Sequence, residues 1–138
     1  MERVLKKKSE AGHYKADACI VWCFDDRFSP LLESFMREKQ FSHIDLIKIA
    51  GGGAKDLASP ADASAREYLL GQVANSIKLH HTPLVILMAH SECGAYDGSI
   101  DESFYVAELK KAANVVKEKF PAILVESYFA DFDGMSLV

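Results

Sequence analysis

A continuous apolar run at residues 84–89, directly after Pro83, constrains the fold of this chain more than any other feature. A run without polar interruptions is typical of a strand that is covered on both faces, as in a parallel sheet with helices on either side. The run is far too short to span a bilayer. It therefore predicts the central strand of an α/β sheet.

Three more strand-like segments alternate with helical patterns along the chain. Strands that alternate with helices are typical of βαβ units and of a mostly parallel sheet. Residues 131–134 are expected to form a turn. The expected strands are residues 18–23, 44–50, 84–89 and 122–128, and the expected helices run from Ser29 to about Gln40, from Asp62 or Ser64 through Ile77, and from about Ser103 to Lys119.

Two of the expected helices carry local signals at their start. Ser29 followed by Pro30 is expected to be an N-cap with proline at the first helical position. Ser64 and Glu67 have the spacing of a capping box, in which each residue binds the backbone of the other. These signals predict where both helices begin.

Composition narrows the class of protein. The 138 residues are enough for one domain, which we expect to cover residues 1–138. The formal net charge of −4 provides no electrostatic footprint for nucleic acid. No apolar run follows the basic residues near the N-terminus, so neither a secretory signal nor a membrane anchor is expected. Three cysteines are an odd number, which excludes a complete set of disulfides and favours the reducing cytoplasm.

Residues 23–27 follow the first expected strand and carry a thiol, a carboxylate and a guanidinium. If the backbone stays extended, Cys23, Asp25 and Arg27 share one face, and Asp26 points the other way. Arg27 can then hold Asp25 in a bidentate pair, which lowers the pKa of that carboxyl. The alternative interpretation is a thiol at the end of a strand beside a surface ion pair.

His90 and Cys93 follow the central strand and are three residues apart in the sequence. In a turn, this spacing brings an imidazole and a thiol to the same side, and both are good zinc ligands. The alternative is a histidine and a cysteine that cap and pack a turn between a strand and a helix.

The two segments together make a stronger case than either does alone. Open parallel sheets bind ligands outside the carboxyl ends of their strands, at the point where the strand order reverses. If the first and third strands are neighbours, Cys23, His90 and Cys93 converge there. Two sulfurs and one nitrogen leave one position of a tetrahedral zinc ion open, which is the pattern of a catalytic site.

The Cys-x-Asp-x-Arg motif at residues 23–27 and the His-x-x-Cys motif at residues 90–93 resemble the zinc site of the β-class carbonic anhydrases. The chain differs from the family pattern at Asp26, at Gly52 and at Ala89. The resemblance covers about residues 18–134 and includes Ala50-Gly51, Glu67-Tyr68 at a helix start, residues 83–95, and Asn114-Val115 followed by Pro121.

This resemblance implies an α/β fold with a mostly parallel four-stranded sheet, in strand order 2-1-3-4, flanked by helices. It implies one Zn²⁺ per chain, with Cys23, His90 and Cys93 as ligands and with Asp25 and Arg27 as the catalytic dyad. Zinc-bound hydroxide would hydrate carbon dioxide reversibly to bicarbonate, in a homodimer or higher homo-oligomer. In the family, the aspartate either orients the hydroxide or, in a closed form, takes the fourth metal position itself.

Two other functions stay open at this point. The same site could act on a relative of carbon dioxide, such as carbon disulfide or carbonyl sulfide. The chain could instead be a non-catalytic zinc-binding domain, with Asp25 locked on the metal.

Three other features have simpler interpretations. Residues 51–53 are all glycine, which favours close approach of the backbone over a phosphate-binding loop, since neither of the usual phosphate-loop motifs is present. Cys19 is expected to be a buried free cysteine. His80 and His81 are expected to cap the C-terminus of a helix, the alternatives being proton shuttling or a second metal site.

Overall fold

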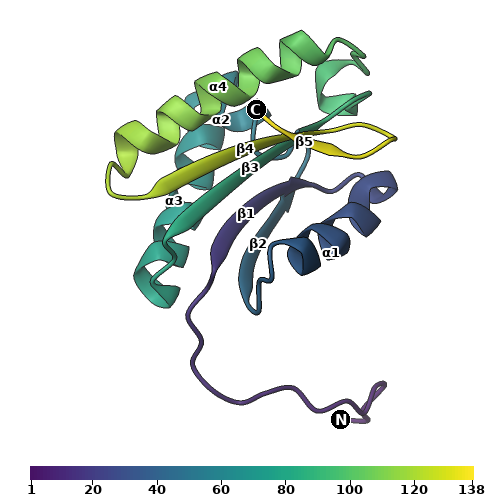
Figure 1. Cartoon of the computed structure of the whole chain (residues 1–138). Coiled ribbons are helices and arrows are strands. Elements are labelled where there is room, and N and C mark those ends of the chain that lie inside the picture. Colours follow the sequence, from purple (N-terminus) through teal and green to yellow (C-terminus); the bar gives the residue numbers. More distant parts are fainter.

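The computed structural model describes residues 1–138, and its five strands form one sheet in the order β2-β1-β3-β4-β5 (Figure 1). The first four strands pair in parallel, and β5 runs antiparallel to β4. The predicted α/β fold and the order of the four parallel strands are confirmed, but the sheet has one more strand than predicted. The strands are β1 (Ala18–Cys23), β2 (Ile44–Ile49), β3 (Leu84–His90), β4 (Leu124–Ala130) and β5 (Met135–Leu137).

The additional strand follows the turn that the sequence predicts at residues 131–134. The backbone N–H of Asp131 donates to the carbonyl of Gly134 at 2.9 Å. The Asp131 carboxylate accepts from the backbone N–H groups of Asp133 and Gly134. This turn reverses the chain onto β4. Because β5 has only 3 residues, it is too short to show an alternating pattern in the sequence.

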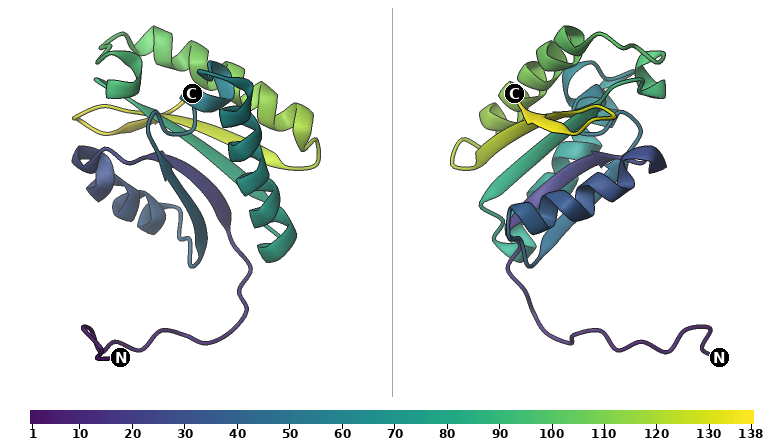
Figure 2. Two further views of the ribbon diagram at one scale, coloured as in Figure 1. Left: turned by 180° about the vertical axis from the view of Figure 1, so that it is seen from behind. Right: turned by 45° about the vertical axis from the view of Figure 1, so that its right-hand side comes forward.

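The helices cover both faces of the sheet. One face carries α1, and the other carries α2, α3 and α4 (Figure 2). None of them is long and apolar enough to cross a membrane. The helices are α1 (Ser29–Glu38), α2 (Lys55–Ala58), α3 (Ala63–His80) and α4 (Glu102–Lys119), with short 3₁₀ turns at η1 (Asp26–Phe28) and η2 (Gly94–Tyr96).

The central strands β1 and β3 lie in the middle of the hydrophobic core. Every residue of β1 is buried, and in β3 only Leu84 is partly exposed. This confirms the apolar run at residues 84–89 as a central strand that is covered on both faces. In contrast, β2 forms an edge of the sheet and has no fully buried residue.

The predicted starts of α1 and α3 are confirmed to within a residue, but the predicted caps are wrong. Ser29 is the first residue of α1 and not its N-cap, because η1 leads straight into the helix, and its hydroxyl accepts from Lys48 Nζ at 2.9 Å. The N-cap of α3 is Asp62, whose carboxylate accepts from the backbone N–H of Ser64 at 2.8 Å. Ser64 therefore lies inside the first turn and forms no capping box with Glu67.

Some element boundaries also differ from the predicted ones. β4 begins and ends later than residues 122–128, because the chain turns at residues 121–122 before the strand begins. α1 ends at Glu38, short of Gln40, whose φ of +55° is left-handed. The sequence gives no signal for α2, since its 4 residues are too few for a helical period.

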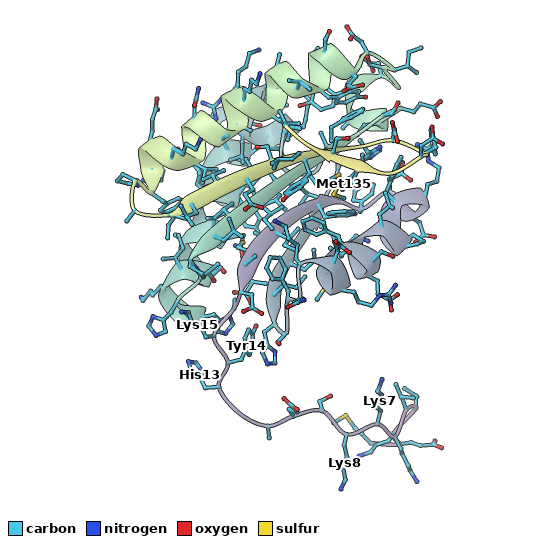
Figure 3. The ribbon with its side chains drawn as sticks, in the orientation of Figure 1. Lys7, Lys8, His13, Tyr14, Lys15 and Met135 are labelled. Carbon is cyan, nitrogen blue, oxygen red and sulfur yellow. The ribbon has the colours of Figure 1, made fainter.

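The N-terminal segment lies outside the body of the molecule. Residues 1–13 are exposed along their whole length, and Tyr14 is the first residue that is partly buried (Figure 3). The described elements therefore begin at the amino end of β1.

The glycine run at residues 51–53 packs directly against the central strands. Gly52 has a φ of +56°, and a Cβ at this position would lie 2.3 Å from the carbonyl oxygen of Met88 and 3.1 Å from the nitrogen of Cys23. A Cβ on Gly53 would lie 2.6 Å from the Cα of Leu87. The close approach of the backbone that the sequence predicts is confirmed.

Alanine at Gly53 is expected to destabilise the fold by about 2 kcal/mol or more, because a methyl group there would overlap the β3 backbone. Gly71 in α3 is the matched control, since a Cβ there would meet nothing within 4 Å. Alanine at Gly71 should raise stability by about 0.5–1 kcal/mol, the usual gain in a helix. Urea unfolding of both variants measures the difference, and equal stabilities would contradict the close packing.

Candidate metal centre

Three side chains that can bind a metal meet at the carboxyl ends of the central strands. Cys23 is the last residue of β1, His90 is the last residue of β3, and Cys93 lies in the loop that follows. The two Sγ atoms and a ring nitrogen of His90 all lie within 4.8 Å of one another. All three residues are buried. This group could therefore hold a metal ion.

The ring of His90 is oriented by its own loop. Its Nδ1 donates to the carbonyl of Ser91 at 2.8 Å, so the lone pair is on Nε2. Phe28 stacks on the ring, with 4.4 Å between the ring centroids. The Nε2 atom is buried and has no hydrogen-bond partner in the protein. A metal ion fits this position, since it would provide the partner that the lone pair lacks.

The two thiols shift the pKa of each other in opposite directions. The hydrogen bond from the Cys93 thiol lowers the pKa of Cys23 below its ordinary value, and His90 lowers it further. The pKa of Cys93 is raised in turn by the hydrogen bond to the Cys23 sulfur. A metal ion bound here would favour the deprotonated form of both sulfurs, because the thiolate is the form of cysteine that binds metals.

Cys93 is held in place by a buried tyrosine. The hydroxyl of Tyr105 accepts from the backbone N–H of Cys93 at 3.2 Å and donates to the carbonyl of Ser99 at 2.8 Å. Tyr105 is fully buried on α4 and connects both ends of the loop. No local pattern in the sequence indicates this role of Tyr105, because its partners come near only after folding.

Asp25 and Arg27 form a close pair, but not in the predicted extended conformation. The chain enters η1 directly after Asp25, which caps the turn by accepting from the backbone N–H of Arg27 at 3.0 Å. The guanidinium folds back onto the same carboxylate, with Nη2 at 2.8 Å from Oδ2 and Nε at 3.1 Å from Oδ1. Hydrogen bonds from Arg27 hold the pKa of the Asp25 carboxyl below its ordinary value.

Two further residues contact the guanidinium and were missed in the sequence. Glu92 accepts from Nη1 of Arg27 at 3.1 Å. The ring of Phe132, in the turn between β4 and β5, lies with its centroid 5.3 Å from the guanidinium carbon. Both contacts join distant parts of the chain, so no local pattern indicates them.

A pocket of about 470 Å³ opens onto the thiols and onto Asp25. Apolar and small side chains make up most of its wall. Such a pocket admits small molecules with little polar character beside a few polar groups. It is lined by Cys23, Phe24, Asp25, Ala50, Gly51, Cys93, Gly94 and Ala95.

The comparison with protein families agrees with this geometry. A family model described as "Putative carbonic anhydrase" matches residues 14–136, which is most of the chain. The chain belongs to this carbonic anhydrase family.

Solved structures place this carbonic anhydrase family member beside the β class. A β-carbonic anhydrase of Trichomonas vaginalis aligns with a TM-score of 0.62 at 12% identity, over 96% of this chain and 87% of that one. A tetrameric β-carbonic anhydrase of Sordaria macrospora aligns with a TM-score of 0.56 at 14% identity, over 92% of this chain and 82% of that one. At these identities the likeness shows the fold. The predicted resemblance to the β class is confirmed.

The matches to sequence relatives cover only part of the chain. An uncharacterized protein of Rickettsia conorii is 31% identical over 68 residues, which are 42% of this chain and 37% of that protein. The match therefore spans less than half the length of that relative.

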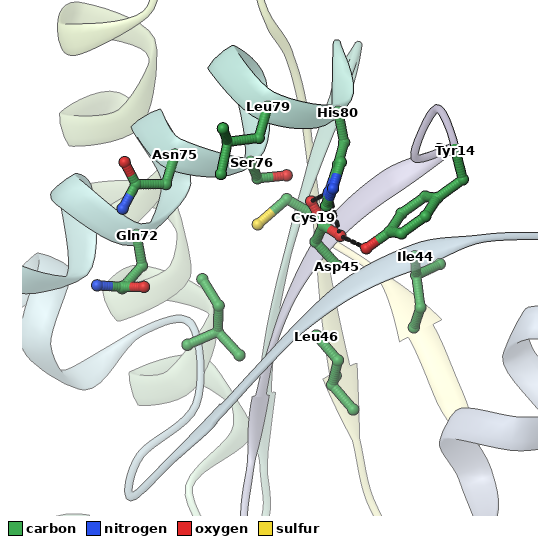
Figure 4. Close-up of a pocket in the computed structure, with 11 residues that line it drawn as sticks. Tyr14, Cys19, Ile44, Asp45, Leu46, Gln72, Asn75, Ser76, Leu79 and His80 are labelled. Carbon is green, nitrogen blue, oxygen red and sulfur yellow. Dashed lines mark hydrogen bonds and ion pairs between the residues drawn. The ribbon is translucent and has the colours of Figure 1, made fainter. Parts of the chain in front are cut away.

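Cys19 and His80 lie at the opposite end of the sheet, beside a second pocket of about 360 Å³ (Figure 4). His80 Nδ1 lies 2.8 Å from Asp45 Oδ2, and the Tyr14 hydroxyl donates to Asp45 Oδ1 at 2.7 Å. The His80 ring is thus held by a carboxylate on β2, while His81, with a φ of +51°, ends α3. Cys19 is buried as predicted, and burial raises the pKa of its thiol to about 12.

Asp45 is expected to stabilise the fold in a pH-dependent way. Burial raises the pKa of its carboxyl, but hydrogen bonds from Tyr14, Ser76 and His80 outweigh burial, and the pKa lies below its ordinary value. Such a group stabilises the fold above its unfolded pKa of about 4, and the contribution is lost as the pH falls through the folded pKa.

The variant Asp45→Asn should therefore be about 1–2 kcal/mol less stable than the wild type at pH 7, with a gap that shrinks below about pH 4. Denaturant unfolding at pH 7, 5 and 3 measures this gap. Asp133→Asn, which changes an exposed carboxyl, is the control. A gap that does not change with pH would contradict the expected role.

Proposed function

We propose that this chain catalyses the reversible hydration of carbon dioxide to bicarbonate, with one zinc ion held by Cys23, His90 and Cys93. The observation that carries the proposal is the buried Nε2 of His90, which has no protein partner and lies beside two thiols. Two sulfurs and one imidazole nitrogen suit zinc better than magnesium or calcium. Three protein ligands leave one position of a tetrahedral ion for an exogenous molecule.

Zinc bound here would supply hydroxide near neutral pH, because it lowers the pKa of water from 15.7 to about 7. The two cysteine ligands would offset the charge of the ion. We therefore expect less acidification than at a site with three histidines, and activity that rises above neutral pH.

In this proposal, Asp25 and Arg27 are the catalytic dyad. Arg27 keeps Asp25 ionised and holds its carboxylate in a fixed direction. Asp25 accepts a hydrogen bond from the attacking group and so directs the lone pair of that group at carbon dioxide. The engagement of Asp25 by Arg27 favours this role over a non-catalytic zinc domain, in which Asp25 would bind the metal itself.

The pocket supports carbon dioxide as the substrate. Phe24, Ala50 and Ala95 give it an apolar wall beside the thiols. Carbon dioxide is small and has no net dipole, so it can leave water for such a wall at little cost. Bicarbonate is charged and well hydrated, and it therefore leaves the same pocket readily.

Metal analysis and stopped-flow hydration of carbon dioxide between pH 7 and 9 test the proposal. The wild type should contain one zinc ion per chain and should be more active at pH 9 than at pH 7. Cys93→Ser should lose the zinc. Asp25→Asn should keep the zinc but lose about 10²-fold in kcat, because the attacking group is no longer directed. Asp26→Asn, the exposed neighbour, should stay near the wild-type rate.

Stoichiometric zinc without hydration at any of these pH values would overturn the proposed activity. If the same preparation hydrolysed carbonyl sulfide or carbon disulfide, the substrate would be one of these analogues. Zinc content that is equal in the wild type and in Cys93→Ser would overturn the ligand assignment.

We also propose that the chain works as a homodimer or higher homo-oligomer in the cytoplasm. β2 is an edge strand, so one row of its backbone donors and acceptors has no partner in the sheet. Leu46 on this strand is 41% exposed. A pocket of about 600 Å³ lies beside the strand, with Ile47, Ile49 and Tyr68 in its wall. The free state of all three cysteines suits a reducing compartment.

Sedimentation velocity over a range of concentrations tests the assembly. The wild type should sediment as a dimer or larger species, and Leu46→Lys should weaken the association about tenfold by placing a charge in the interface. Leu124→Lys is the control, because this side chain on β4 is 70% exposed and its replacement should not disturb the fold. It should have no effect on the association. A wild type that sediments only as a monomer would contradict the proposal.

A further inference from the structure

The guanidinium of Arg27 binds two acidic residues from two different loops. One edge of the group faces Asp25, while Nη1 donates to Oε2 of Glu92 at 3.1 Å. Nη2 also donates to the backbone carbonyl of Glu92 at 3.2 Å. Glu92 lies between His90 and Cys93, so Arg27 connects the loop after β1 to the loop that carries two of the three candidate metal ligands.

The backbone at Glu92 does not itself require a glutamate. Its φ of +56° is left-handed, a conformation that glycine adopts without steric cost. The backbone N–H donates to the carbonyl of Ser99 at 2.8 Å, which any residue could do. The side chain makes its hydrogen bond and its ion pair with Arg27. The glutamate side chain at this position therefore contributes a hydrogen bond and an ion pair that restrain Arg27.

Aromatic rings limit the position of the guanidinium but not its rotation. Its carbon lies 5.3 Å from the ring centroid of Phe132 and 5.8 Å from that of Phe28. Ring contacts of this kind have no preferred direction within the plane of the guanidinium. The rotation is fixed by hydrogen-bond acceptors, and the side-chain acceptors here are Asp25 and Glu92.

The direction of Asp25 matters because it lies close to the candidate metal position. Its Oδ2 is 3.9 Å from Nε2 of His90 while it is bound to Arg27. We propose that Glu92 is a positioning residue, which fixes Arg27 and thereby keeps Asp25 on the guanidinium and out of the fourth metal position. This inference rests on the proposed function, since an open fourth position matters only if the site acts on an exogenous molecule.

Glu92→Gly and Glu92→Gln form a matched pair for the test. Both remove the negative charge, but only glutamine keeps a side-chain oxygen that can accept from Nη1 of Arg27. Glycine suits the left-handed backbone, so Glu92→Gly should remain folded, and its melting temperature verifies this. Each protein is loaded with Co²⁺ and titrated with azide, and visible absorption then reports access to the fourth position without any turnover.

The apparent dissociation constant of azide should be about threefold to fivefold higher for Glu92→Gly than for Glu92→Gln, the scale of a half-exposed ion pair. A crystal structure of Co²⁺-loaded Glu92→Gly should show Asp25 turned toward the metal. Glu33→Gln, which breaks an exposed ion pair with Arg37 on α1, should match the wild type. Equal constants for the glycine and glutamine variants would overturn the positioning role.

The outcomes separate this inference from the proposed function. If the two Glu92 variants differ in azide binding and the wild type does not hydrate carbon dioxide, the positioning role stands and the proposed activity fails. If carbon dioxide is hydrated and the variants bind azide equally, only the positioning role fails. A wild type that binds no Co²⁺ would overturn both.

Discussion

The parallel pairing of β1 with β3 is the constraint on which the candidate metal centre depends. The register places Val21 opposite Leu87, so two residues further along Cys23 is level with Ala89, one residue before His90. A slip of one residue would turn every side chain of β1 to the other face of the sheet. Burial of β1 on both faces opposes such a slip, because the turned side chains would not fit the close-packed sites on the other face. The thiol and the imidazole thus meet because the core is packed around these strands.

The glycine run after β2 adds a second constraint on the same site. The loop crosses the amide of Cys23 and the carbonyl of Met88 so closely that no side chain would fit between them. Ala50 and Gly51 then form part of the pocket wall. Room for a small ligand beside the thiols exists because the loop carries almost no side-chain volume where it crosses the strands. The same glycine run therefore determines both the packing of the loop and the shape of the pocket.

Sequence patterns predicted the parts of this molecule that depend on neighbours along the chain. The apolar run of β3 and the spacing of His90 and Cys93 are of this kind. Tyr105 and Glu92 were missed, because their roles depend on partners that only folding brings near: Arg27 and Glu92 are 65 residues apart. The extended conformation expected after Cys23 was wrong for a related reason. A side-chain hydrogen bond to a backbone two residues away favoured a turn over continued strand, and no periodicity reveals that competition.

The chain enters the sheet at the end opposite the candidate metal centre. Tyr14 contacts Asp45 beside the amino ends of β1 and β2, and the segment before it runs away from the body (Figure 1). Any segment joined to residue 1 would therefore emerge far from the mouth of the pocket. A tether to a surface or a fusion to a second protein through this end would therefore leave the pocket beside the thiols at the far end of the sheet.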